Sequence, residues 1–249
     1  MSISNLLTPE RINELNEFQK KYNLDFSNLE LLNQAFIHTS YVNENKIDVS
    51  FSYERLEFLG DAVLKLAVSD FYYEYFPDYQ EGKMTKLRGE IVSDKNIFSY
   101  ALELGFDDLI ILGKNEKKHG GAKKESIIAC AFEAFLGAIY LEYKENGYQK
   151  AKEFLKDNFL DDILNIDKKI AILNPKAILQ EYTQAKNHKL PVYNLIETKG
   201  LEHDKTFYVE VVYNNEVLGK GFEKSLKQAQ QEAALNALVN LKLIDREKI

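Results

Sequence analysis

The chain has 249 residues, of which 45% are hydrophobic and 29% are charged, a balance typical of a soluble globular protein. No segment reaches the roughly 20 apolar residues of a membrane span, and the first residues lack a secretory signal, so we expect no membrane association. The single cysteine, Cys130, excludes an intrachain disulfide and a zinc site built from several cysteines. It also favours a reducing, cytoplasmic location.

The charge is unevenly distributed along the chain. The net charge is −7, which argues against a protein that coats nucleic acid by bulk attraction. Residues 174–249 carry 11 basic and 10 acidic side chains, whereas residues 1–173 carry 21 basic and 29 acidic ones. The two parts of the chain therefore indicate two different modules.

The first part is expected to be helical throughout. Thr8 and Pro9 mark a helix start, because a threonine N-cap is followed by proline at the first helical position. That helix is expected to end near Lys21. The apolar patterns that follow predict helices over residues 28–40, 53–76, 83–104, 125–143 and 148–164, with loops over 43–51 and 113–124. We predict an all-α domain over residues 8–164 and a linker over residues 165–173.

The last part changes its hydrophobic period from that of helices to that of strands. Phe207, Val209 and Val211 alternate with other residues, as in a half-buried strand. Asn214 and Asn215 are typical of a tight hairpin turn. We predict a small α-β-β-β-α domain over residues 174–243. Its expected elements are a helix over 175–185, strands over 192–199, 206–213 and 216–222, and a helix over 225–241.

Three carboxylates recur at helical spacing in the helix expected over 53–76. Glu54, Glu57 and Asp61 fall within roughly 60° of one another on one helix face. Like charges stacked in this way repel, so the cluster indicates either a bound divalent cation with oxygen ligands or a solvated acidic stripe. Apolar side chains occupy the gaps between the acids, and this favours the cation site.

Two further acids are candidates for the same site. Glu81 follows the end of that helix, where it could return toward the same face. Glu133 lies midway along a strongly apolar helix, and a carboxylate there should be paired or bound to metal, because burying an isolated charge is costly. The alternative for Glu133 is a salt bridge to Arg55 or Lys86.

Five segments of the chain resemble ribonuclease III. Residues 54–61 read Glu-Arg-Leu-Glu-Phe-Leu-Gly-Asp, which matches the signature of that family without a gap. Four other segments resemble further family elements in the same order, and these are residues 35–41, 81–88, 125–134 and 176–182. The resemblance covers about residues 24–242.

The resemblance implies a homodimeric, Mg²⁺-dependent endonuclease that cuts double-stranded RNA, leaves 5′-phosphate and 3′-hydroxyl ends, and acts in rRNA and mRNA processing. By position, Glu57, Asp61 and Glu133 would bind the metal, and the loss of Asp61 or Glu133 would be most damaging. Glu54 and Glu81 would line the cleavage site, near the scissile strand or a second metal. Such a metal lowers the pKa of a bound water and offsets charge on the leaving oxygen.

One position departs from the family pattern. Cys130 stands where the family has a metal-ligating aspartate, three residues before Glu133 and on the same helix face. A neutral thiol is a poor Mg²⁺ ligand, and a thiolate prefers softer metals. Water could replace the missing carboxylate, Mn²⁺ could be preferred, or the protein could bind RNA and cut it poorly or not at all. We favour retained activity, because the other acids of the site are present.

The resemblance also assigns RNA contacts to the last domain, which would recognise the shape of an A-form duplex. The implied contacts lie on the first helix, on the loop between the first two strands and at the start of the last helix: Gln180, Glu181, His203, Lys224, Ser225 and Lys227. The family usually has a second lysine where this chain has Leu226. RNA affinity is therefore expected to be modest and sensitive to salt.

Phe58 lies within the acidic signature and faces away from its carboxylates. It resembles the aromatic side chain that enters the partner's catalytic domain in the family dimer. The alternative is an ordinary core phenylalanine of the same chain, and the sequence leaves both open. In a dimer, two sites related by a two-fold axis would cut the two strands of one duplex.

Overall fold

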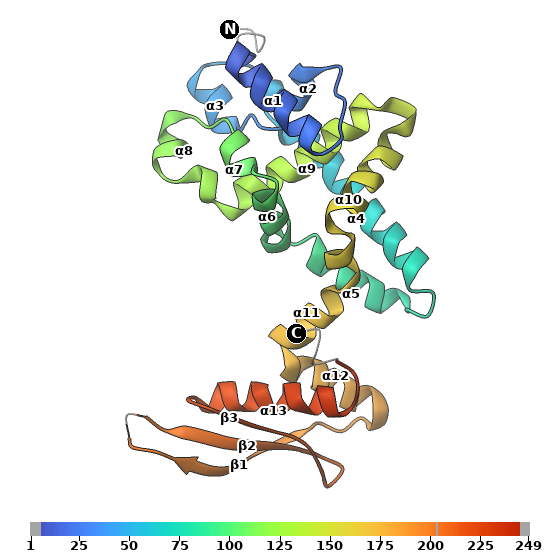
Figure 1. The fold of residues 1–249 in the computed structure, drawn as a ribbon, viewed down its shortest axis with the longest axis vertical. Helices are drawn as coiled ribbons and strands as arrows, with labels where there is room; N and C mark the ends of the chain where they lie inside the picture. The colour runs from blue at the N-terminus through green and yellow to red at the C-terminus, as the bar shows by residue number, and fades with distance from the viewer. Residues whose placement is uncertain (1–5, 203, 245–249) are drawn as a thin grey trace. The chain divides into compact units, whose positions relative to one another are not determined.

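A computed structural model describes residues 6–202 and 204–244, and the chain divides into two compact units, Met1–Leu164 and Asn165–Ile249. The first unit is helical, and the second holds a three-stranded sheet with helices, as predicted (Figure 1). Within the described ranges, no helix combines the length and the apolar character that crossing a bilayer requires.

The first unit consists of α-helices joined by loops and short 3₁₀ turns. Its described α-helices are α1 (Pro9–Lys21), α2 (Leu29–Gln34), α3 (Thr39–Glu44), α4 (Glu54–Tyr75), α5 (Glu81–Ile91), α6 (Asp94–Glu103), α7 (Phe106–Leu109), α8 (Lys114–Lys118), α9 (Glu125–Glu142) and α10 (Gly147–Leu164). Its 3₁₀ turns are η2 (Val49–Phe51), η3 (Gly121–Lys123) and η4 (Lys144–Asn146).

Local chemistry explains several of these boundaries. The hydroxyl oxygen of Thr8 accepts a hydrogen bond from the Arg11 N–H at 3.3 Å, which confirms the predicted start of α1. Gly105 follows α6 with a φ of 82°, a left-handed conformation that glycine adopts without steric cost.

The structure corrects some expected elements. The helix predicted over residues 83–104 is two helices, because extended Ser93 ends α5 and begins α6 as its N-cap. The helix predicted over 28–40 is likewise interrupted, since the His38 side chain caps a new helix, α3. The loop over 113–124 contains α8 and η3, and the expected linker 165–173 contains helix α11 (Ile166–Leu173). The domain limits themselves stay predictions.

The core of the first unit is built around α9, which packs most extensively against α4 and also contacts α2, α6 and α10 (Figure 1). Nearly every apolar residue of α9 is buried, including Phe132 and Phe135. Their rings pack against Phe106 in edge-on and tilted geometries. Helix α9 is therefore the central helix of this unit, with α4 as its main neighbour.

The second unit has the order α-β-β-β-α after α11. Its elements are α12 (Pro175–Asn187), β1 (Val192–Lys199), β2 (Thr206–Tyr213), β3 (Glu216–Glu223) and α13 (Leu226–Asn240). The strands are antiparallel in the order β1-β2-β3. Asn214 and Asn215 have φ values of 50° and 68°, as the predicted tight hairpin requires.

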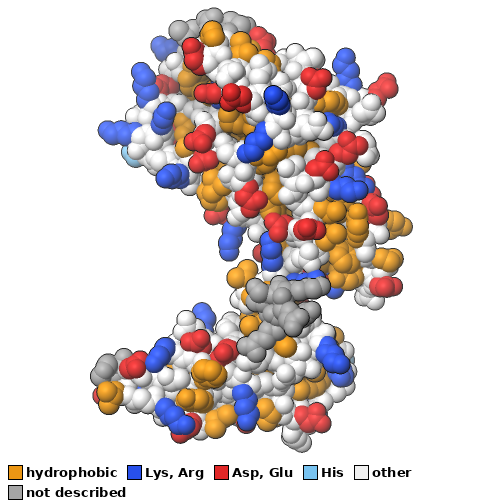
Figure 2. Space-filling model, viewed as in Figure 1, with side chains coloured by type: hydrophobic (Ala, Val, Ile, Leu, Met, Phe, Trp, Pro, Cys, Tyr) orange, Lys and Arg blue, Asp and Glu red, His pale blue; other side chains and the backbone are white. Residues whose placement is uncertain are grey.

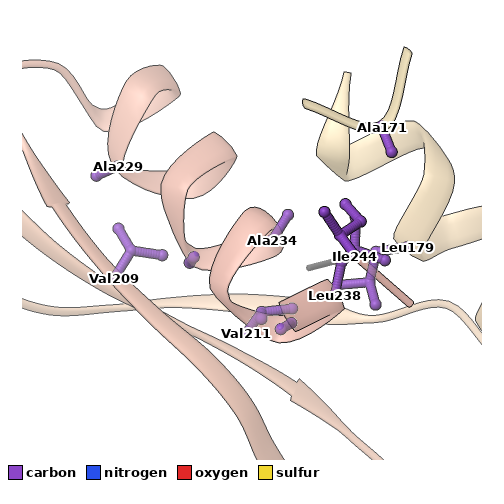
Figure 3. Close-up of a cluster of buried hydrophobic side chains, with 10 residues drawn as sticks. Ala171, Leu179, Val209, Val211, Ala229, Ala234, Leu238 and Ile244 are labelled. Atoms are coloured by element: carbon purple, nitrogen blue, oxygen red, sulfur yellow. The ribbon is translucent and has the colours of Figure 1, made fainter. Parts of the chain in front are cut away.

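One face of this sheet is covered by helices. Val209 and Val211 of β2 point into a cluster with Leu179 of α12 and Leu238 of α13 (Figure 3). Helix α13 approaches β3 closely at Gly219, where an added β-carbon would lie 2.4 Å from the carbonyl oxygen of Ala233. The alternating Phe207, Val209 and Val211 thus mark the face that the sequence pattern predicts as buried.

Candidate active site

The site lies where α4 crosses α9, and glycines allow the two helices to touch. A β-carbon on Gly60 would lie 1.7 Å from the carbonyl oxygen of Glu133, and one on Gly137 would lie 2.3 Å from that of Leu56. Any larger residue would force the backbones apart, since real β-carbons do not approach so closely. The contact places Glu57 of α4 beside the part of α9 that carries Cys130 and Glu133.

Glu57, Cys130 and Glu133 form one compact group of potential metal ligands. One ligand atom from each residue, a carboxylate oxygen or the Cys130 sulfur, lies within 4.8 Å of the other two. All three side chains are half-buried. The structure therefore brings together two of the three predicted metal-binding acids and the cysteine at the position of the expected aspartate.

Asp61 lies one turn further along α4, outside this group. Its carboxylate accepts a hydrogen bond from Lys65 Nζ at 2.7 Å, an i,i+4 ion pair on the same helix. Its charge still raises the pKa of Glu57 and of Glu133, so it belongs to the same electrostatic site.

The carboxylates of the site are crowded and partly removed from water. Burial, followed by the charges of Asp61, Glu57 and Asp94, raises the pKa of Glu133 to about 8. Burial also raises the pKa of Glu57, although a hydrogen bond from Cys130 opposes this change. Burial is therefore the main cause of both raised pKa values, and the neighbouring negative charges add to it.

Cys130 is a thiol in this environment. Burial is the largest cause that raises the pKa of Cys130 far above its usual range, and the charge of Glu57 adds to it. The protonated thiol donates a hydrogen bond to the Glu57 carboxylate. In the absence of a metal, Cys130 is therefore a neutral partner of Glu57.

The structure adds one acid that the sequence analysis missed. Asp94 is the first residue of α6, and its charge raises the pKa of Glu57, Cys130 and Glu133. The sequence analysis predicted one continuous helix over residues 83–104, in which Asp94 is an ordinary interior position and not the start of a helix. The signal is present in Ser93-Asp94, since a serine N-cap followed by an acid is typical of a helix start.

Glu54 and Glu81 are placed differently from the central group. Both are exposed and both begin helices, α4 and α5 respectively. The charge of Glu54 contributes to the raised pKa of Glu57. Glu81 accepts a hydrogen bond from Thr85 at 2.9 Å and lines a pocket with Arg88, and it is not a member of the ligand group.

A salt bridge of Glu133 to Arg55 or Lys86 is the predicted alternative to a metal site, and neither residue is among the causes that shift the pKa of Glu133. The cation that acts on the pKa of Glu133 is Lys65. Glu133 is therefore a partly buried carboxylate, and a further positive partner would stabilise its ionised form.

The candidate RNA contacts of the second unit lie on its surface. Gln180 and Glu181 are exposed on α12, and Lys227 is exposed in the first turn of α13. Ser225 caps that helix by accepting the Gln228 N–H at 3.2 Å. Lys224 Nζ lies 2.6 Å from an Asp204 carboxylate oxygen. His203 lies outside the described residues.

Comparisons with known proteins match both units. Residues 28–163 match the ribonuclease-III-like family, and residues 175–241 match the double-stranded RNA binding motif. Ribonuclease 3 of Enterococcus faecalis is 42% identical over 225 residues, which cover 90% of this chain and 96% of that protein. Ribonuclease 3 of Listeria innocua is 40% identical over 230 residues, 92% of this chain and 99% of that protein.

A solved structure also resembles the first unit. It is the nuclease domain of ribonuclease III from Campylobacter jejuni, which aligns with this chain with a TM-score of 0.51 at 35% sequence identity. That structure shows flexibility in a region involved in dimer formation of the Campylobacter protein. The alignment covers 57% of this chain and 96% of that domain.

A helical nuclease domain followed by a double-stranded-RNA-binding domain defines an endoribonuclease that acts on double-stranded RNA. This chain belongs to the ribonuclease III family, with 40–42% identity to these two members over 90–92% of its length. Enzymes of this family are typically metal-dependent. Nothing in the comparisons supports the alternative of a binding protein that has lost its activity.

Proposed function

We propose that the chain hydrolyses phosphodiester bonds of double-stranded RNA at the group formed by Glu57, Asp61 and Glu133, with Mg²⁺ as its metal and Mn²⁺ as an alternative. The observation that carries this proposal is the convergence of ligand atoms of Glu57, Cys130 and Glu133 within 4.8 Å at the α4–α9 crossing, with the charge of Asp61 acting on both glutamates. Carboxylate oxygens are hard donors that suit Mg²⁺. The raised pKa of Glu133 supports the same assignment, because a divalent cation would offset the crowded negative charge.

Each residue has a defined part in this proposal. Glu57 and Glu133 hold the cation from two helices, and Asp61 adds a third carboxylate beside them. A cation held by these residues would supply an activated water for attack on phosphorus and offset charge on the leaving oxygen, and the products would carry 5′-phosphate and 3′-hydroxyl ends. Glu54 and Glu81, both exposed, line the path of the scissile strand.

Cys130 takes the position of a fourth carboxylate without its charge. As a thiol that donates to Glu57, it would orient that carboxylate, and a water would serve as ligand in place of the missing carboxylate. Mg²⁺ accepts several water ligands readily, so activity is retained with weaker metal affinity than an aspartate would confer.

The second domain holds the duplex through Gln180, Glu181, Lys224, Ser225 and Lys227. Lysines at the start of α13 lie where the helix N-terminus already favours phosphate oxygens. Leu226 is exposed between Ser225 and Lys227 and carries no charge, which limits the affinity for the RNA duplex. The natural substrates on this proposal are rRNA and mRNA precursors in the cytoplasm.

The nuclease domain is proposed to act as a homodimer. Phe58 is 84% exposed although it is a large aromatic residue, which supports an intersubunit contact over a core position within one chain. Leu66 and Tyr73 are exposed further along the same helix, and Figure 2 shows hydrophobic side chains gathered over the end of this unit where α4 and α5 meet. Such a surface is typical of an interface between subunits.

Cleavage of an end-labelled RNA duplex tests the proposed function. The purified chain is incubated with the duplex in Mg²⁺, in Mn²⁺ and in a chelator, and with a single strand of the same sequence as a control. We expect cleavage of the duplex alone, in either metal and not in the chelator. No cleavage in either metal would contradict the proposal.

A further inference from the structure

The ligand group at the α4–α9 crossing combines hard and soft donors. Glu57 and Glu133 offer carboxylate oxygens, whereas Cys130 offers sulfur, and the three ligand atoms lie within 4.8 Å of one another. Zinc is bound by thiolate sulfur at about 2.3 Å and by carboxylate oxygen at about 2.0–2.2 Å. The three donors are thus of the types that zinc binds, and they lie close enough together to share one cation.

We propose that this centre also binds a thiophilic divalent cation of the Zn²⁺ class, with the Cys130 thiolate, Glu57 and Glu133 as its ligands. On binding, the S–H bond breaks, the sulfur lone pair coordinates the cation and the proton passes to solvent. The inference rests on the proposed function only in treating these residues as the metal centre.

The arrangement of the three residues supports tight binding of a soft cation. Cys130 and Glu133 are one helical turn apart on α9, and the glycine contact at Gly60 holds Glu57 of α4 beside them. Thiolate ligands select zinc and related ions over Mg²⁺, which prefers oxygen donors. The two kinds of cation share Glu57 and Glu133, so each excludes the other. A thiophilic cation therefore inhibits cleavage reversibly by occupying the catalytic centre.

Cd²⁺ is a suitable probe, because cadmium bound to a thiolate produces an ultraviolet charge-transfer band. The full-length chain contains one cysteine, so the band reports Cys130 alone. Titration of Cd²⁺ without RNA is expected to give the band at one equivalent per chain, at the same ratio over a range of protein concentrations. Zn²⁺ is expected to displace Cd²⁺ and abolish the band.

Variants test the ligand assignment directly. Cys130→Ser is expected to lose the band, and Glu133→Gln to weaken Cd²⁺ binding by on the order of tenfold or more. Glu103→Gln changes an exposed acid of α6 and serves as the matched control with unchanged binding. Cys130→Asp is expected to lose the band and to reach half-maximal cleavage at a lower Mg²⁺ concentration.

Two results would overturn the inference: no band in the unmodified chain, or equal Cd²⁺ affinity in the Glu133→Gln and Glu103→Gln variants. The same preparation is assayed for duplex cleavage in Mg²⁺ and Mn²⁺. Cleavage without a cadmium band overturns the thiophilic site and leaves the proposed function intact. A band that meets every expectation, without cleavage in either metal, supports the thiophilic site and contradicts the proposed function.

Discussion

Gly60 of α4 lies directly against the backbone carbonyl of Glu133 in α9, so closely that a β-carbon on Gly60 would lie 1.7 Å from that oxygen. Gly60→Ala therefore forces the two helices apart. Overpacking of a core of this kind costs about 1–3 kcal/mol of unfolding free energy. The change should also separate Glu57 from Glu133. Urea unfolding and duplex cleavage measure the two effects, and both stability and activity are expected to fall.

Gly89→Ala is the matched control for this prediction. Gly89 lies within α5, and no atom lies within 4 Å of the position of its absent β-carbon. Alanine there should stabilise the helix by about 0.5–1 kcal/mol. If Gly60→Ala were as stable and as active as Gly89→Ala, the close helix crossing would not hold the site together.

Without metal, stability should fall as the pH rises toward 8. The pKa of Glu133 is about 8 in the folded protein, against an ordinary value of 4.5 in the unfolded chain. The folded state therefore binds more protons between these values, and its stability decreases as the pH rises through that window. Urea unfolding in a chelator over pH 4–9 measures the slope, and Glu133→Gln should flatten it.

Asp94→Asn tests whether the missed acid contributes to this effect. The charge of Asp94 is one of the causes that raise the pKa of Glu133. Its removal should lower that pKa, so the upper limit of the pH range over which stability falls should move to lower pH. Glu103→Gln, also in α6, should leave the profile unchanged. Identical profiles in the two variants would place Asp94 outside the electrostatic site.

Phe58→Ala should weaken self-association of the nuclease domain. The ring is 84% exposed in one chain, and burying a phenylalanine contributes about 2 kcal/mol. A two-fold interface loses two rings, so the dissociation constant should rise on the order of 1000-fold. Analytical ultracentrifugation measures it, with Leu102→Ala of α6 as the exposed apolar control. Equal dissociation constants for both variants would remove Phe58 from the interface.

Lys224→Ala should reduce the salt dependence of RNA binding. A lysine that neutralises one phosphate contributes about one unit to the slope of log K against log salt concentration. Filter binding of a duplex at several salt concentrations measures that slope. Lys220→Ala is the control, because this residue of β3 lies on the sheet face opposite to the one covered by α13. An unchanged slope for Lys224→Ala would rule out its phosphate contact.

Local patterns predicted most of the fold. The strands over 192–199 and 206–213 follow from alternation and turn chemistry, and their limits match those of β1 and β2. The break between α5 and α6 was missed, because apolar residues on both sides of Ser93 continue the helical period and mask the N-cap. The helix in 165–173 was missed because the segment is short and lies between Asn165 and Asn174-Pro175, residues typical of loops, although Ile166, Ile170 and Leu173 recur at helical spacing.

The acidic residues of the site were predictable from the sequence, but the helix packing that brings them together was not. Helical spacing grouped Glu57 with Asp61, and the apolar surroundings of Glu133 indicated that its charge needs a partner. The crossing of α4 and α9 at Gly60 is a contact between distant segments, which no local period encodes. The ion pair of Asp61 with Lys65, which holds that carboxylate outside the central group, could have been found from its i,i+4 spacing.

The most direct test of the metal centre is the single-turnover rate of duplex cleavage by Glu133→Gln in saturating Mg²⁺. The substitution keeps the shape of the side chain and removes the charge that would hold the cation. Because metal stabilisation of the transition state is worth several kcal/mol, the rate should fall by on the order of 100-fold or more, with RNA affinity unchanged. A rate equal to that of the Glu103→Gln control would contradict the assignment of Glu133 to the catalytic centre.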